Sequence, residues 1–157
     1  MYKNVVLAGD VVAAEMAFSD PYASDSLLYA SKLTEELRNM STTMGRSLAS
    51  LDLCKNEFTE DVKRKNTPGT YAVVAAVVCK AHSVPLISCL QGIAYAELSS
   101  MVFAALRMNK LNFIEGQKLI GSLLDRFFVP EEFGPFNPLA DILSRKHQVR
   151  EPKMFLS

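Results

Sequence analysis

The sequence carries no net charge, because seventeen basic residues balance seventeen acidic ones. A chain without an overall field of either sign has no long-range attraction to nucleic acid, to an anionic membrane or to an acidic substrate. We therefore expect no nucleic acid and no membrane among its partners, and recognition through a local surface instead. Apolar residues make up 49% of the chain, which is enough to supply an interface in addition to a core.

Cysteine is scarce, and Cys54, Cys79 and Cys89 show no short paired spacing. Such usage favours a reducing compartment over a secreted disulfide scaffold. The first residues lack the basic lead and the cleavage pattern of a signal peptide. The longest apolar runs are also well short of the ~20 residues that span a bilayer. Together these absences predict a cytoplasmic chain.

Signatures of catalysis are missing as well. The sequence contains no G-x-S-x-G, P-loop, GxGxxG or HExxH pattern. Adjacent carboxylates at 35–36, 60–61 and 131–132 lie in polar stretches rather than in an apolar pocket, so they are expected to be ordinary surface charge. We therefore expect a protein that is not an enzyme and that binds no cofactor directly.

A weak candidate for a metal site is the pair Cys79 and His82, which lie three residues apart and would share one face of a helix. Two ligands alone make a poor site. The alternative is that Cys79 packs in the core and that His82 lies at a helix C-terminus, where a protonated imidazole is favourable.

What the sequence has in abundance is a helical spacing of apolar residues. An early helix is expected from about Asn4 to Phe18. Pro21 should then bar continuation, and a long amphipathic helix should follow between 24 and 53, capped by Ser24 or Asp25. Its apolar positions recur at steps of three and four, and such a stripe requires a partner surface. The positions are Leu33, Leu37, Met40, Met44, Leu48 and Leu51.

The middle of the chain contains a stretch of ambiguous character, YAVVAAVVC. Its β-branched residues have strand propensity, but the interspersed alanines and the lack of a second strand favour a buried helix, which should start at Thr67-Pro68. The polar segment 54–69 before it is expected to be a loop with at most a short helix. Its basic run is expected to be a solvated face rather than a functional basic patch.

Prolines mark the remaining helices. Ser83 and Pro85 should open a helix over about 86–108. Its inward-pointing residues are expected to be Leu86, Ile87, Leu90, Ile93, Ala94, Leu98, Met101 and Val102. Further helices are expected over about 114–128 and, after Asn137-Pro138, up to Pro152. The prediction is a single all-α domain, a compact bundle of about five to seven helices.

Three stretches carry a more specific pattern. The first, ELRNMSTTMGRSLASL, has Leu-Arg, a polar residue, then Gly and a leucine pair. The second, from Thr67 to Leu124, has an Ala-rich helix, a helix with a Tyr and a Ser-rich step, an Ala-Ala-hydrophobic-Arg end and Gly-Gln before a leucine run. The third is the closing NPLADILSRKHQVREPKMFLS. In order and spacing, the three resemble the urease accessory protein UreF family over roughly residues 25–157.

The positions that match this pattern fall into the three stretches. They are Arg38, Gly45 and Leu48; Tyr95, Ser99, Ala104, Ala105, Arg107, Gly116, Gln117 and Leu119; and Pro138, Asp141, Ile142, Ser144, His147, Lys153, Phe155 and Ser157.

The chain also departs from the family pattern. It lacks the Pro-x-Gly-x-(Phe/Tyr)-x-x-Ser-x-Gly-Leu-Glu motif of the family's N-terminal helical stretch, so a shortened member or a fragment is expected. Asn112 and Phe113 stand where the family has Gly and Gln. Lys153 keeps a cation in the tail but loses the planar bidentate fork of arginine.

The resemblance implies an all-helical UreF-like domain over 1–149 and a partner-binding tail over 150–157. UreF proteins are non-enzymatic scaffolds that form homodimers and bind UreD, also called UreH. The pair recruits the GTPase UreG, which carries nickel to apo-urease. By this carry-over the nickel is handled by the complex and no metal is bound by the chain itself.

The same resemblance suggests which residues meet partners. The partner-binding residues would be Asp141, Ser144, His147, Lys153, Met154, Phe155, Leu156 and Ser157. The candidates that face a dimer partner or the GTPase are Tyr95, Ser99, Arg107, Lys110 and Gln117.

Several alternatives stay open. One alternative is that the apolar tail folds back on its own domain instead of docking on UreD. Another is that Tyr95 and Ser99 serve core packing alone. In a second reading the protein regulates GTP hydrolysis by UreG, with Arg107, Lys110, Gln117 and Arg126 as the groups presented to the nucleotide. In a third reading the domain has kept the fold and lost the urease role.

Overall fold

The computed structural model describes residues 2–136 and residue 142, and these residues form helices and no strands. The prediction of a single all-α domain is confirmed. The elements are η1 (Tyr2–Val11), which has π-helical geometry, α1 (Val12–Ala17), α2 (Pro21–Ser31), α3 (Glu35–Ala49), α4 (Glu57–Arg64), α5 (Tyr71–Ala81), α6 (Leu86–Arg107) and α7 (Phe113–Leu124).

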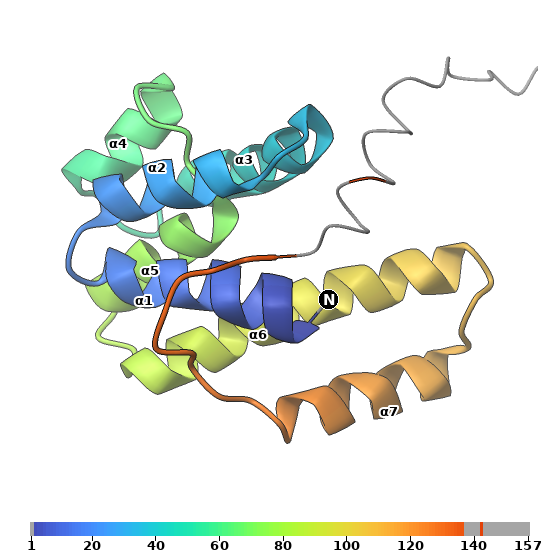
Figure 1. Cartoon of the computed structure of the whole chain (residues 1–157). Coiled ribbons are helices and arrows are strands. Elements are labelled where there is room, and N and C mark those ends of the chain that lie inside the picture. Colours follow the sequence, from blue (N-terminus) through green and yellow to red (C-terminus); the bar gives the residue numbers. More distant parts are fainter. Residues whose placement is uncertain (1, 137–141, 143–157) are drawn as a thin grey trace, which may run out of the picture.

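The helix α5 lies at the centre of the fold, and it packs against α1, α3 and α6 (Figure 1). Its residues Ala72–Val77 are all buried. A helix that buries consecutive residues must be covered on every side, and its alanines let those neighbours approach. The predicted buried helix is thereby confirmed, and the strand propensity of this stretch is overridden by its surroundings.

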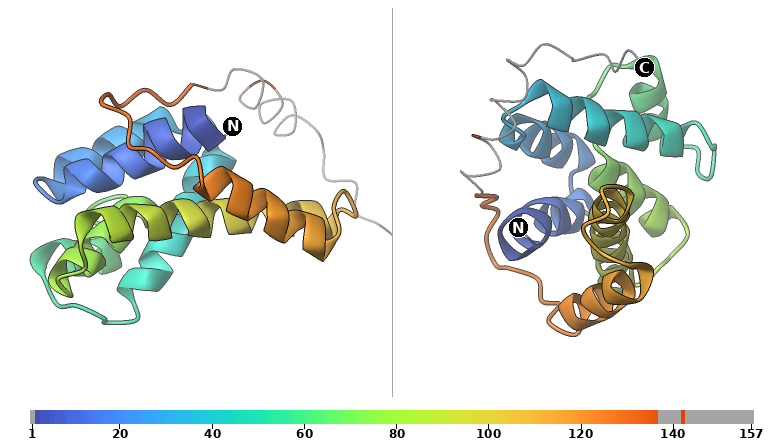
Figure 2. Two further views of the ribbon diagram at one scale, coloured as in Figure 1. Left: turned by 90° about the horizontal axis from the view of Figure 1, so that it is seen from below. Right: turned by 90° about the vertical axis from the view of Figure 1, so that its right-hand side faces the viewer.

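The continuous helix of η1 and α1 agrees with the helix expected over Asn4–Phe18. It lies between the part of the fold made of α2, α3 and α4 and the part made of α6 and α7 (Figures 1 and 2). Val6, Leu7 and Val11 are fully buried there, so this helix joins the two parts through one core.

The prediction of one long helix between 24 and 53 is wrong, because the chain forms two helices there, α2 and α3. The backbone is extended at Lys32, and Thr34 is the N-cap of α3. The predicted break at Pro21 is present, since α1 ends at Ala17 and Pro21 is the first residue of α2, where its fixed φ suits the first helical turn. The cap is Asp20, whose carboxylate accepts a 3.0 Å hydrogen bond from the Ala23 backbone N–H.

The helix α3 buries a different face from the one that its leucines and methionines mark. Ser41, Thr42, Gly45 and Ala49 are buried, whereas Met40 on the apolar stripe is 53% exposed. A Cβ at Gly45 would lie 2.0 Å from the Gly69 carbonyl oxygen, so only a residue without a side chain permits this approach of α3 to the start of α5. The stripe is therefore only partly covered by the described residues.

Asp25 is not a helix cap but a buried anchor. Its carboxylate accepts four hydrogen bonds of 2.7 Å, from the hydroxyls of Thr67 and Thr70 and from the backbone N–H groups of Gly69 and Thr70. Thr67-Pro68 therefore belongs to the loop around this carboxylate, and α5 starts later than predicted, at Tyr71. Gly69 has φ +73°, a conformation that favours glycine.

The polar segment before α5 contains one short helix, as predicted. A capping box between Asn56 and Thr59 begins α4. Within the basic run, Lys63 pairs with Asp52 and Glu60, while Arg64 and Lys65 are exposed.

The helix α6 has the predicted extent, but its first turn is oriented differently. Leu86 and Ile87 are exposed rather than inward, because no described element covers that side of the helix. By length and composition α6 is able to cross a bilayer, a test that the core helix of a soluble protein also passes. It packs here against η1, α5 and α7, and 33% of its most apolar window is buried.

The chain leaves α7 earlier than expected and returns to the start of the fold. The helix ends at Leu124, and the segment 129–136 then runs back along η1 (Figure 1). The Gly134 N–H donates to the Ala8 carbonyl and the Phe136 N–H to the Asn4 carbonyl, both at 2.9 Å. Of the last helix predicted up to Pro152, only Ile142 is described, and it is helical.

Candidate interaction surfaces

The antiparallel hairpin of α6 and α7 holds most of the candidate residues that the structure describes (Figure 2). Arg107 ends α6 and Lys110 lies in the turn, and both are exposed. Gln117 lies near the start of α7 and is half-buried. These three residues therefore lie near the same end of the hairpin. Arg126 lies beyond the other end of α7, about 18 Å away for a helix of this length.

The turn of this hairpin combines apolar and basic side chains. Met108, Phe113 and Ile114 are each at least 60% exposed, next to Arg107 and Lys110. Aromatic residues, methionine and arginine are enriched where proteins bind one another. We name this set (Arg107, Met108, Lys110, Phe113 and Ile114) the hairpin tip.

The hairpin tip has a fixed backbone. The Asn112 side chain accepts a 2.9 Å hydrogen bond from the Glu115 N–H, and the Glu115 carboxylate accepts a 3.0 Å bond from the Asn112 N–H. This reciprocal capping box holds the first turn of α7. The replacement of the family's Gly by Asn112 thus provides a helix cap.

One stripe of α6 is covered along half its length. Ile87, Gln91, Tyr95, Leu98, Val102 and Leu106 follow at steps of three or four and so share a face. Leu98 and Val102 are buried with Ile120 of α7, and a Cβ at Gly116 would lie 2.6 Å from the Val102 side chain. Ile87 and Tyr95 are half-exposed, because the described part of α7 covers only the second half of the stripe.

Tyr95 and Ser99 lie at the border between these two halves. Tyr95 presents its ring to solvent, whereas Ser99 is buried. Among the described residues, the Ser99 hydroxyl has no hydrogen-bond partner. A buried hydroxyl without a partner is costly, but this oxygen is enclosed and offers no surface to a partner, whereas the neighbouring Tyr95 does.

Cys79 and His82 are not brought together. The Cys79 thiol is hydrogen-bonded to Cys89 of α6, and burial, followed by this hydrogen bond, raises the pKa of the Cys89 thiol far above its ordinary value. The His82 Nε2 lies 2.9 Å from the Leu53 carbonyl oxygen, at the C-terminus of α5. Within residues 2–136 and 142, no group of three or more His, Cys, Asp or Glu side chains is placed to hold a metal ion.

A charged cluster that consists of the buried Asp10 and the half-buried Lys32 and Glu97 was not anticipated from the sequence. Asp10 of η1 accepts a 3.1 Å hydrogen bond from Lys32, which lies between α2 and α3. Burial and then the Asp10 carboxylate raise the pKa of Glu97 on α6 to about 7, although the Lys32 ammonium opposes this. The available signal was that Asp10 and Glu97 interrupt apolar stretches, LAGDVV and AYAELSS, where charged residues are rare unless paired.

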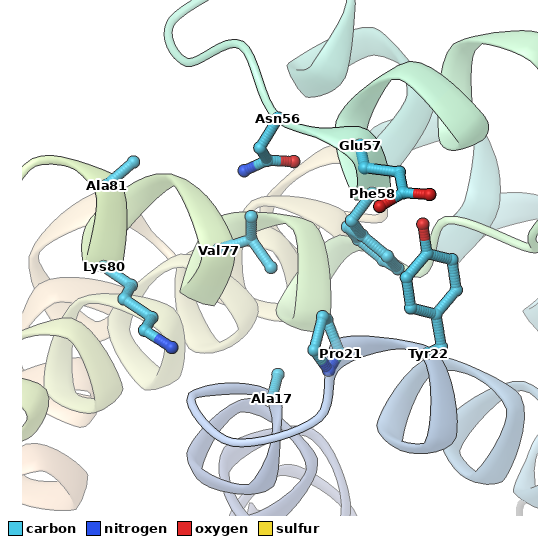
Figure 3. A pocket seen from close by; sticks show the side chains of 9 residues that line it. All are labelled: Ala17, Pro21, Tyr22, Asn56, Glu57, Phe58, Val77, Lys80 and Ala81. Carbon is cyan, nitrogen blue, oxygen red and sulfur yellow. The ribbon is translucent and has the colours of Figure 1, made fainter.

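A pocket of about 470 Å³ was also not anticipated. It lies between the α1–α2 corner, the start of α4 and the end of α5 (Figure 3). Its lining is mostly apolar: Ala17, Pro21, Tyr22, Phe58, Val77 and Ala81, with Asn56, Glu57 and Lys80 as polar members. It combines residues from four helices, and sequence periodicity does not indicate how separate helices meet.

The predicted partner-binding residues all lie outside the described part of the chain. They are Asp141, Ser144, His147, Lys153, Met154, Phe155, Leu156 and Ser157. Their assignment to a partner surface stays a prediction.

The fold and these surfaces define a class: a helical protein with several apolar surface patches. Comparison with known proteins specifies it further. The family model for UreF matches residues 5–124, and the chain belongs to the UreF family.

Its curated relatives agree. The chain is 26% identical over 148 residues to urease accessory protein UreF 1 of Brucella melitensis, and 28% identical over 139 residues to urease accessory protein UreF of Yersinia pestis. These alignments cover 85% and 79% of the chain. The aligned region is only 61% of the length of either relative. No solved structure matches the chain with significance.

Proposed function

We propose that this protein is a scaffold in the maturation of urease. It binds UreD (UreH), and the pair recruits the GTPase UreG so that nickel is inserted into apo-urease. It works in the cytoplasm as a homodimer, and nickel is handled by the complex rather than by a site in this chain. The observation that carries the proposal is membership of the UreF family, over residues 5–124.

The surface of the described residues supports a binding role. The hairpin tip presents large apolar side chains on a capped, rigid turn, and the exposed half of the α6 stripe offers a second apolar area. Both have the composition of protein interfaces. The apolar residues 154–156 would provide a third contact, on UreD.

Co-purification with the cognate UreD tests this proposal. The intact chain is expected to retain UreD, and the double variant Met154→Asp and Phe155→Asp is expected to weaken retention at least about tenfold, because apolar anchors dominate such interfaces. Leu51→Asp is the control, since Leu51 is an exposed apolar residue of the loop after α3. Failure of the folded intact chain to bind UreD would contradict the scaffold role.

Regulation of UreG is the second candidate function, and the end of the hairpin favours it. Arg107, Lys110 and Gln117 lie near that end, whereas Arg126 lies beyond the other end of α7. GTP turnover by UreG is expected to change with the intact chain and to revert with Arg107→Ala. Turnover that is the same in all cases would exclude regulation.

The third interpretation is that the domain has kept the fold and lost its role in urease maturation. A chain that folds cooperatively but supports no urease activation would favour it.

A further inference from the structure

The pocket beside α4 has an apolar floor and an acidic side (Figure 3). Phe58, Val77 and Ala81 form the floor. On the acidic side, the Tyr22 hydroxyl donates a 2.8 Å hydrogen bond to Asp61, and Glu57 is close enough to contribute its charge. The hydrogen bond to Asp61, burial and the charges of Asp61 and Glu57 raise the pKa of Tyr22 to about 12. The pocket thus suits a large apolar side chain that is preceded or followed by a cation.

A pocket of this volume is within the range of ligand-binding clefts, and one or two large side chains would fit in it. Lys80, at its other edge, is already engaged, since its ammonium donates to the Phe18 carbonyl. Asp61 lies outside the pocket lining and is influenced by the charge of Arg64, whereas no cation of the lining other than the engaged Lys80 is available to Glu57. Its occupant should therefore bring a positive charge to Glu57.

The chain itself contains a segment with this chemistry. Residues 153–156 read Lys-Met-Phe-Leu, one cation followed by three large apolar side chains. We propose that this segment docks in the pocket of its own chain, with Phe155 against Phe58 and Val77 and with Lys153 beside Glu57.

The segment is able to reach the pocket. The chain is fixed at Phe136 by its hydrogen bond to Asn4, near the start of η1, and the pocket includes Ala17, at the end of α1. The distance is therefore about the length of η1 and α1, at most about 24 Å. Residues 137–152 are as numerous as residues 2–17, so a chain of this length would cover the distance even at the rise of a helix and would exceed it at the rise of an extended chain.

The docking does not rest on the proposed scaffold function, because it concerns the chain without any partner. It has a consequence for that function, however. The same three apolar side chains cannot contact the pocket and UreD at once. Self-docking would lower the apparent affinity for UreD by the fraction of molecules whose tail is free.

Photo-crosslinking of the intact, isolated chain tests the proposal. Replacement of Phe155 by p-benzoylphenylalanine keeps an aromatic side chain and attaches to C–H groups within reach on illumination. The expected product has the mass of a monomer, and its crosslink maps to residues 17–22, 56–58 or 77–81. A crosslink to the α3 stripe or the hairpin tip, a product with the mass of a dimer, or no product would each overturn the proposal.

A pair of matched variants tests the charge contact. Glu57 and Glu35 are both exposed first residues of helices, α4 and α3. Glu57→Gln is expected to lower the yield of the pocket crosslink about twofold or more, and Glu35→Gln to leave it unchanged. Equal yields would overturn the contact of Lys153 with Glu57. Because UreD is absent, a negative result would leave the scaffold function untouched.

Discussion

Asp25 is fully buried, and its carboxylate is surrounded by four donors of the loop before α5. A carboxylate fits this place because it offers acceptors only, and hydrogen bonds to an ionised acceptor are stronger than those between neutral groups. An amide would present N–H groups to some of these donors. At the scale of the residue, one side chain thus ties α2 to the start of the central helix.

Asp25→Asn is expected to lower the free energy of unfolding by about 2–4 kcal/mol, because at least two of the four donors lose their acceptor in a buried place. Urea denaturation followed by circular dichroism measures the change. Asp20→Asn is the control, since asparagine caps a helix as well as aspartate does. A change as small as that of the control would show that the loop finds other acceptors.

Glu97 provides a prediction about pH. An unfolded chain releases this proton near the ordinary pKa of 4.5, whereas the native state holds it up to about 7. The native state then binds more protons between these values, so the free energy of unfolding falls as the pH rises from about 4.5 to about 7. The decrease is about 3 kcal/mol. Asp10, Lys32 and Tyr71 are the ionisable groups that face Glu97.

The variant Glu97→Gln is expected to remove this dependence, because glutamine does not titrate. Denaturation at several pH values between 5.5 and 8 checks it, and Glu131→Gln, at an exposed position, should keep the slope of the parent chain. The pKa values of Asp52 and Asp61 are lowered by their partners, so these two groups titrate below the chosen range. Parallel curves for the parent chain and Glu97→Gln would refute the assignment.

At the scale of the elements, α7 depends on one close approach to α6. Gly116 lies against the Val102 side chain, whereas a Cβ at Gly121 of the same helix would meet nothing within 4 Å. Val102 is buried and β-branched, and such a side chain has little freedom to move. The docking of α7, and with it the position of the hairpin tip, thus depends on the missing side chain at Gly116.

Gly116→Ala is expected to destabilise the protein by about 1 kcal/mol, because the overlap with Val102 outweighs the gain in helix propensity. Gly121→Ala should stabilise it by about 0.5–1 kcal/mol. Thermal denaturation of the two variants distinguishes them. If both variants gained stability, α7 would not be packed as closely as described.

The helices were predictable from the sequence to different degrees. The spacing of apolar residues predicted the helix over Asn4–Phe18 and the extent of α6. It joined α2 and α3 into one helix because no proline or glycine marks the break at Lys32, although the stripe of leucines and methionines begins only at Leu33. The face of α3 that is buried consists of small and polar residues, and these become a packing surface only because the loop around Asp25 comes so close. Periodicity does not contain that information.

At the scale of the whole molecule, the all-α class followed from the absence of any second strand, and the family from the order of three stretches. The location of possible sites was less accessible. Arg107, Lys110 and Gln117 lie near one end of the hairpin and the length of α7 separates Arg126 from them, but their roles toward a partner stay predictions. The pocket of four helices and the cluster around Glu97 depend on contacts between distant segments, which a linear pattern does not specify.

Because the segment 129–136 returns to η1, folding of the first helix cannot be completed until this late segment has been synthesised. Asn4 and Ala8 are made more than a hundred residues before Phe136 and Gly134, their hydrogen-bond partners. At about 5–20 residues per second, the early helix waits roughly 6–25 s for them. For much of that time its apolar residues Val6, Leu7 and Val11 lack their final neighbours in α6. These side chains are fully buried in the folded protein, so the nascent chain would expose them to solvent and to chaperones near the ribosome.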